Sequence, residues 1–121
     1  MEKSSLTDLV QQQLAGARAS SSGRSAHTVY GGHGQVLRHT LLALAAGFSL
    51  DEHDNPGEAT VLVLHGRVRL IAGTTGGEGR PGELLIVPRA RHSLAALEDS
   101  VVLLTVAKGG NGYPGPDRRQ P

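Results

Sequence analysis

The sequence predicts an all-β fold, a sandwich or barrel built from short strands. Between residues 27 and 107, apolar segments of strand length alternate with turns rich in Gly, Pro, Asn and Asp, and no stretch of helical periodicity interrupts them. Short strands at such intervals are typical of antiparallel sheets rather than of parallel α/β folds. The runs TVLVL and VVLLTV are apolar on both faces, which indicates strands covered on each side, by the protein itself or by a second subunit.

An amphipathic helix is expected near the N-terminus. Apolar residues recur at helical spacing from Leu6 to Leu14. Ser5, followed three residues later by Asp8, resembles a capping box with an acid in place of Glu or Gln. The helix is expected to end near Gly16. The small polar residues of the next segment, residues 17–26, predict a flexible tether.

The rest of the chain is predicted to form a barrel and a tail. Strands are expected at residues 27–30, 36–44, 59–64, 67–72, 83–87, 93–97 and 101–107. The segment GTTGGEG, residues 73–79, is predicted to be a hairpin loop. The terminal segment is rich in Gly, Pro and charge and is predicted to be disordered. The expected organisation is a helical arm and linker at 1–26, a barrel at 27–107 and a tail at 108–121.

Composition excludes several classes of function. The chain of 121 residues suits one domain, and it lacks Cys, so disulfides and thiolate metal sites are excluded. A net charge of +1, from 12 basic and 11 acidic residues in scattered groups, argues against nucleic-acid binding. The N-terminus lacks the apolar core of a secretory signal, and no stretch is apolar enough to span a bilayer. We therefore expect a cytoplasmic protein without membrane or nucleic-acid partners.

Two sequence blocks resemble the paired motifs of a known family. They are EHDNPGEATVLVLHGRV, residues 52–68, and GELLIVPRARH, residues 82–92. Each combines a Gly/Pro turn, an apolar strand and a histidine, in the order found in the cupin superfamily. The resemblance covers about residues 35–107. It implies a cupin-type double-stranded β-helix, which is a jelly-roll barrel.

The same resemblance suggests which residues line a pocket. It places His53 at the first histidine of the first motif, with Asn55 where the second histidine usually stands. Ala59 falls at the position of the usual metal-binding Glu, and His92 matches the histidine of the second motif. Pocket positions are therefore expected for all four residues. Only the two histidines among them are usual metal ligands of the family.

A third metal ligand has two candidates. His39 alternates with apolar residues along its strand, so it joins the pocket if that face is the barrel interior, and otherwise faces outward. Glu58 lies one residue from the expected carboxylate position and turns inward only if the chain bulges there. Family sites typically hold one divalent transition metal, Fe, Mn, Ni, Cu or Zn. The sequence leaves open whether His53 and His92 hold such an ion or none.

Two classes of function fit these residues. In the first, a cupin barrel binds a small apolar or weakly anionic molecule in a His-lined pocket, with at most a weak or atypical metal site. In the second, a metal-dependent cupin enzyme of the dioxygenase, isomerase or lyase type uses His53, His92 and a third ligand. A metal-free variant would use one of these imidazoles as general acid or base. The strands with two apolar faces and the unpaired sheet edges also predict a homodimer.

Overall fold

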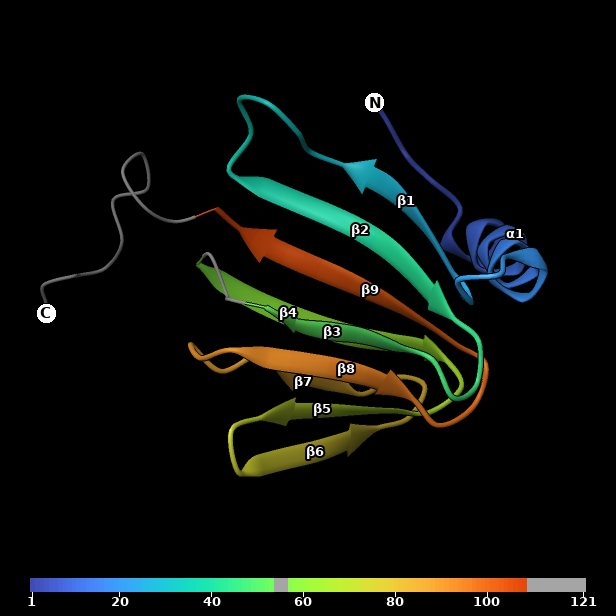
Figure 1. Ribbon diagram of the computed structural model, residues 1–121. Coiled ribbons are helices and arrows are strands. Elements are labelled where there is room, and N and C mark those ends of the chain that lie inside the picture. Colours follow the sequence, from blue (N-terminus) through green and yellow to red (C-terminus); the bar gives the residue numbers. More distant parts are fainter. Residues whose placement is uncertain (54–56, 109–121) are drawn as a thin grey trace, which may run out of the picture.

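The structure is a computed structural model that describes residues 1–53 and 57–108, with only the backbone described at 52 and 53. A helix lies beside a body of strands (Figure 1). The elements are α1 (Leu6–Ala19), β1 (Arg24–Tyr30), β2 (Leu37–Leu44), β3 (Ser49–His53), β4 (Glu58–His65), β5 (Val68–Ala72), β6 (Thr75–Gly79), β7 (Leu84–Ile86), β8 (His92–Ala96) and β9 (Ser100–Ala107).

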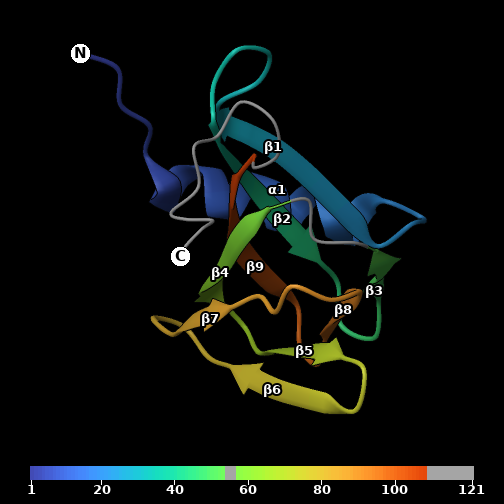
Figure 2. The same ribbon diagram turned by 90° about the vertical axis from the view of Figure 1, so that its left-hand side faces the viewer.

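The strands form two sheets that face each other. One sheet has five strands in the order β1-β2-β9-β4-β7, and the other has four in the order β3-β8-β5-β6. Every strand pair in them is antiparallel. In Figure 2, β1, β2 and β4 of the first sheet lie above β5 and β6 of the second, and buried residues of both sheets share one core. This arrangement confirms the predicted all-β jelly-roll barrel.

The interior between the sheets is filled by aliphatic side chains. Alternate residues of the central strands point into it, as the two-residue period of a strand requires. The buried members of this barrel core are Leu42, Leu44, Ala59, Val61, Val63, Val68, Leu70, Val87, Leu94, Ala96, Val102 and Val106. The barrel core therefore draws on both sheets.

A second core lies between α1 and the outer face of the five-stranded sheet. It contains the helical residues Val10, Leu14 and Ala17, together with strand residues that alternate with those of the barrel core. On β2, for example, Leu41 packs under the helix, whereas Leu42 packs inside the barrel. The helix therefore covers the outer apolar face of the central strands. Of the two possibilities left open by the sequence, the protein itself or a second subunit, the protein itself provides this cover.

The N-terminal arm is more ordered than its composition predicts. Ser5 is the N-cap of α1 and its Oγ accepts the backbone N–H of Asp8 at 3.3 Å, which confirms the capping prediction. The helix continues past Gly16 to Ala19, and β1 starts at Arg24. The expected flexible tether at residues 17–26 is therefore wrong, because Ala17 is buried against the sheet.

Two strands were not predicted. The segment expected to be a hairpin loop, residues 73–79, instead contains β6, which pairs with β5 from Val68 opposite Gly79 to Ala72 opposite Thr75. β3 pairs with β8 although it is short and polar. The predicted tail at 108–121 lies outside the described residues apart from Lys108. The backbone N–H of Lys108 donates to the carbonyl oxygen of Val36 at 2.8 Å.

Candidate functional site

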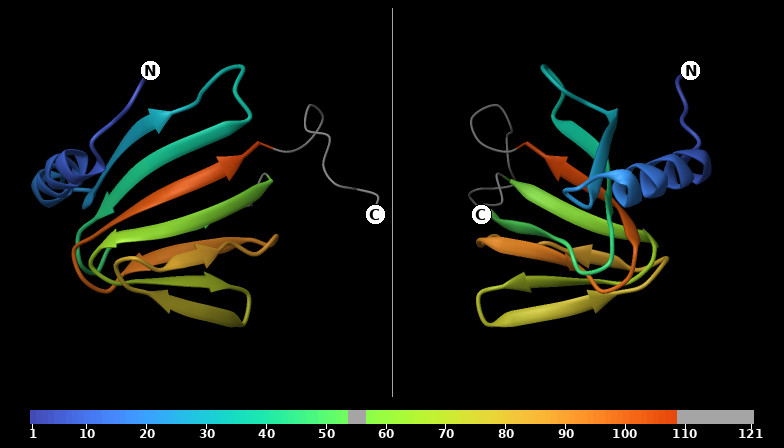
Figure 3. Two further views of the ribbon diagram at one scale, coloured as in Figure 1. Left: turned by 180° about the vertical axis from the view of Figure 1, so that it is seen from behind. Right: turned by 45° about the vertical axis from the view of Figure 1, so that its right-hand side comes forward.

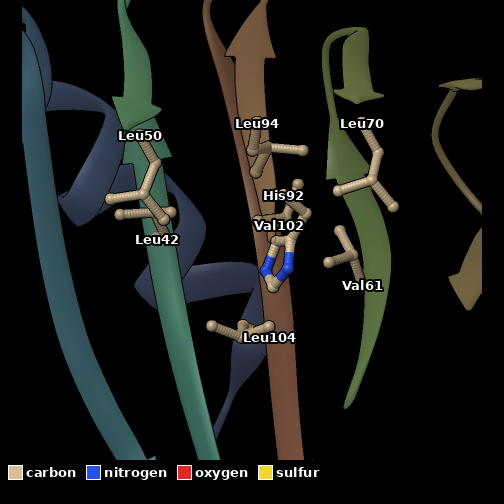
Figure 4. A pocket seen from close by; sticks show the side chains of 8 residues that line it. All are labelled: Leu42, Leu50, Val61, Leu70, His92, Leu94, Val102 and Leu104. Atoms are coloured by element: carbon tan, nitrogen blue, oxygen red, sulfur yellow. The ribbon is translucent and has the colours of Figure 1, made fainter. Parts of the chain in front are cut away.

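The barrel encloses a small cavity between its two sheets. The cavity volume is about 10 Å³, which is room for about one water molecule. Its lining is aliphatic except for one imidazole (Figure 4). The lining residues are Leu42, Leu50, Val61, Leu70, His92, Leu94, Val102 and Leu104.

His92 is the polar group that this cavity offers. It opens β8, where the alternation of the strand turns it to the same inner face as Leu94. Its side chain is buried, and Nδ1 lies 3.1 Å from the carbonyl oxygen of Ala90. Because a carbonyl oxygen only accepts hydrogen bonds, Nδ1 carries the proton in this contact. The contact therefore fixes both the tautomer and the orientation of the ring.

The backbone of the other predicted histidine lies on the neighbouring strand. His53 is the last residue of β3 and stands directly opposite His92 in the register of β3 on β8. The side chain of His53 lies outside the described part of the chain, as does the whole of Asn55. The predicted pocket positions of these two residues therefore stay predictions.

The expected carboxylate position carries no metal-binding group. Ala59 is buried in the barrel core, so this position of β4 does face inward but presents only a methyl group. The neighbouring residue, Glu58, is exposed, and its Oε2 lies 3.8 Å from Nη2 of Arg89. The strand contains no bulge at this point. Glu58 therefore does not face the interior, contrary to its candidacy as third ligand.

His39 lies on the outer side of the five-stranded sheet. It shares a face with Leu41, which packs under α1, and its Nδ1 lies 2.9 Å from Oγ1 of Thr105 on β9. The expectation that His39 joins the interior pocket is therefore wrong, and the outward orientation is the observed one. Among the described side chains, those of residues 1–51 and 57–108, no three from His, Asp or Glu are grouped to hold a metal ion.

Sequence reasoning missed most of the cavity wall. Leu50 and Leu104 line the cavity as much as His92 does, but nothing in an aliphatic strand distinguishes a cavity residue from a core residue. The alternation of side chains along β2 would have identified Leu42 as a lining residue if the sequence had shown which face of that strand points inward.

Solved structures share this architecture. A conserved protein of unknown function from Streptococcus pyogenes matches with a TM-score of 0.67 at 25% identity, over 76% of this chain and 80% of that chain. A cupin superfamily protein from Desulfitobacterium hafniense matches with a TM-score of 0.65 at 18% identity, over 71% and 78%. An RmlC-like cupin from Desulfovibrio desulfuricans matches with a TM-score of 0.62 at 24% identity, over 70% and 82%. The chain has the cupin fold.

The cupin barrel of this chain differs from the motif pattern at the described ligand positions. No protein-family model matches the sequence, and no curated protein matches it. Among the described side chains, which do not include that of His53, only His92 offers a metal-binding atom to the cupin interior, since Ala59 replaces the carboxylate and His39 faces outward. A single imidazole is too few ligands to hold a divalent metal ion. The described side chains therefore do not fit the transition-metal site that the cupin motifs imply. The described residues also include no helix with the length and apolar character needed to cross a bilayer.

Proposed function

We propose that this cupin barrel is a binding module that holds a small apolar or weakly anionic molecule near His92 without chemical turnover. The observation that carries the proposal is the burial of one oriented imidazole among aliphatic walls (Figure 4). Ligand pockets typically combine such apolar walls with a few fixed polar groups. His92 supplies the polar contact, and its bond to Ala90 keeps the ring in place.

The size and charge of the site restrict the ligand. A cavity of about 10 Å³ holds a larger molecule only if wall side chains such as Leu50 or Leu104 move aside, which favours small ligands. Arg89 and Arg91 are exposed in the segment that leads into β8. Cations at this point attract a carboxylate more than an ammonium group. A short-chain carboxylic acid has both the apolar body and the weak negative charge.

The binding test titrates octanoate into the protein by isothermal calorimetry. Octanoate is expected to bind saturably. Replacing His92→Leu removes the polar contact while keeping an apolar wall, so octanoate affinity should fall roughly tenfold. His33→Leu is the matched control, since His33 is exposed in the loop between β1 and β2. Equal octanoate affinity in the two variants, or no saturable binding of octanoate, contradicts the proposal.

The second candidate is a metal-dependent enzyme that uses His53 and His92. The backbone register that sets these residues opposite each other on β3 and β8 favours it. Elemental analysis of protein purified without added metal separates the two functions. The binding module predicts little metal and octanoate affinity that EDTA does not change. A stoichiometric Fe, Mn, Ni, Cu or Zn that is lost in the His53→Ala/His92→Ala double variant would favour the enzyme alternative instead.

We also propose that the cupin barrel forms a homodimer through the edge of its five-stranded sheet. Leu84 and Ile86 on the edge strand β7 are 55% and 69% exposed. They stand opposite Leu62 and Thr60 of β4, respectively, so they extend a partly apolar surface at the sheet edge. An unpaired edge strand with exposed aliphatic side chains is a typical place for a second copy to associate.

A further inference from the structure

A groove outside the barrel is far larger than the cavity inside it. Its volume is about 310 Å³, compared with 10 Å³ for the interior cavity, and ligand pockets typically start at about 300 Å³. The groove is lined by residues 2–4, which precede α1, and by residues of β1, β2 and β9 on the outer side of the five-stranded sheet. Figure 3 shows the course of these segments. Leu6, Val29 and Leu103 form the apolar floor of the groove. The sheet separates it from His92, so it is independent of the proposed interior site.

A β-bulge turns an aromatic ring into this groove. The register of β1 on β2 shifts between Thr28 and Tyr30, which makes Val29 an extra residue. In a regular strand Val29 and Tyr30 would point to opposite faces, but both line the groove. The ring of Tyr30 thereby comes to lie beside that of His39, with centroids 6.3 Å apart and planes inclined by 51°. Bulges often re-aim side chains in this way next to functional sites.

The His39 ring also contacts β9, which pairs with β2 on the side away from β1. Its Nδ1 lies 2.9 Å from Oγ1 of Thr105, and a hydroxyl group both donates and accepts, so either imidazole tautomer satisfies this contact. Nε2 has no protein partner among the described residues. Since His39 lines the groove, Nε2 is the ring nitrogen available to a bound molecule.

The charges around the groove determine the class of ligand. Glu2 and Lys3 both line it, and their opposite charges favour neither an anion nor a cation. The remaining features are an apolar floor, the exposed ring of Tyr30 and one hydrogen-bonding nitrogen. We infer that this groove binds a small, uncharged, planar aromatic molecule, which packs beside Tyr30 and shares one hydrogen bond with Nε2 of His39.

Indole and 1-methylindole test the inference, because they differ in the N–H that would donate to Nε2. The chain contains no Trp and two Tyr, so excitation at the red edge of the indole band, where Tyr does not absorb, reports on indole alone. Indole is expected to bind saturably and roughly tenfold more tightly than 1-methylindole. The variant His39→Leu should bind the two compounds equally. Tyr30→Leu should weaken both by roughly fivefold, since it removes the aromatic contact.

One control variant and one comparison variant keep the test specific. His33→Leu removes an exposed loop histidine and should leave indole affinity unchanged. His92→Leu removes the interior histidine and tests whether indole binds inside the barrel instead. Circular dichroism establishes that each variant is folded before its affinity is compared. Absence of saturable indole binding overturns the inference, as does binding that survives His39→Leu and Tyr30→Leu unchanged. Loss of indole binding in His92→Leu alone also overturns it, by assigning the ligand to the interior.

Discussion

Gly66 occupies a turn between β4 and β5 that accepts no side chain. Its φ of +81° is in the left-handed region, and a Cβ there would overlap the carbonyl oxygen of Asp99 and Oγ of Ser100. Ser100 is itself held in place, since its Oγ accepts the backbone N–H of Arg67 at 3.0 Å and donates to the carbonyl oxygen of Glu98 at 2.7 Å. The neighbouring backbone therefore cannot retreat to make room.

Replacing Gly66→Ala should reduce the free energy of unfolding by roughly 3 kcal/mol or more, because backbone strain and steric overlap add. Substitutions at two other glycines separate the effect of backbone strain from that of steric overlap. Gly73 has a φ of +60° in open space, so Gly73→Ala should cost about 1–2 kcal/mol from strain alone. Gly77 has neither feature, so Gly77→Ala should be nearly neutral. Urea titration measures all three, and equal losses at Gly66 and Gly73 would contradict the steric argument.

Asp99 connects three parts of the molecule. Its Oδ1 accepts the backbone N–H of Ala46 at 2.8 Å, and its Oδ2 lies 2.8 Å from Nε of Arg18 on α1. The hydrogen bond from Ala46, followed by that from Arg18, lowers the pKa of the Asp99 carboxyl below its ordinary value of 3.8. A lowered pKa means that the ionised carboxylate stabilises the folded state.

The stability that Asp99 supplies should therefore be present above pH 3.8 and disappear as the pH falls through its lowered pKa. Asp99→Asn should lower Tm at neutral pH, and the gap to the wild type should narrow in acid. Thermal unfolding followed by circular dichroism over this pH range checks the prediction. Glu2→Gln is the control, because Glu2 is exposed and makes no ion pair with a described residue, so its variant should not show this narrowing. A gap that stays constant with pH would contradict the electrostatic cause.

Single residues of the site were only partly predictable from sequence. The order of glycine, strand and histidine was enough to place His92 in the interior. The same reasoning left His39 open, because both faces of β2 are apolar: Leu41 lies under α1 and Leu42 lies inside the barrel. Tyr30 was missed altogether. A bulge depends on how two strands pair, and the sequence of one strand does not show it.

At the scale of elements, a few buried side chains pack α1 against the sheet. Leu14 is 2% exposed and lies in the core that α1 shares with β2 and β9. Ser25 of β1 donates a further hydrogen bond to the side chain of Gln13. The helix therefore belongs to the folded body, and its loss would expose the outer apolar face of the central strands.

Replacing Leu14→Ala should lower the free energy of unfolding by about 2–5 kcal/mol, since it leaves a cavity between the helix and the sheet. Gln12→Ala is the matched control on the exposed side of the same helix, where a change within about 0.5 kcal/mol is expected. Chemical denaturation measures both variants. A small effect of Leu14→Ala would mean that α1 detaches without consequence for the barrel.

The elements that sequence predicted are those with a strong apolar pattern. The helix and the strands of the barrel core were expected because their side chains repeat with the period of the element. β6 was not, because TGGEG has no apolar residue and forms a strand only through its backbone pairing with β5. β3 was missed for a similar reason, since only Leu50 of its described side chains packs against the core. Whether such a segment forms a strand depends on the strand that it pairs with, and the sequence of the segment alone does not show that partner.

At the scale of the whole molecule, the proposed dimer should depend on β7. Ile86→Lys places a charge at the most exposed aliphatic position of that strand and should shift a dimer to monomer. Ile71→Lys is the control, because Ile71 is a less exposed aliphatic residue of the other sheet. Sedimentation velocity at micromolar concentration distinguishes the two states. A wild-type protein that sediments as a monomer would refute the dimer.

The position of β9 has a consequence for biosynthesis. β9 follows the other described strands in chain order, yet it lies in the middle of its sheet, between β2 and β4, and contributes to both hydrophobic cores. On the ribosome, β2 and β4 therefore emerge without the neighbour that joins them. Neither hydrophobic core can be completed until β9 has left the exit tunnel, so the nascent chain cannot reach the native barrel before residue 107 has emerged.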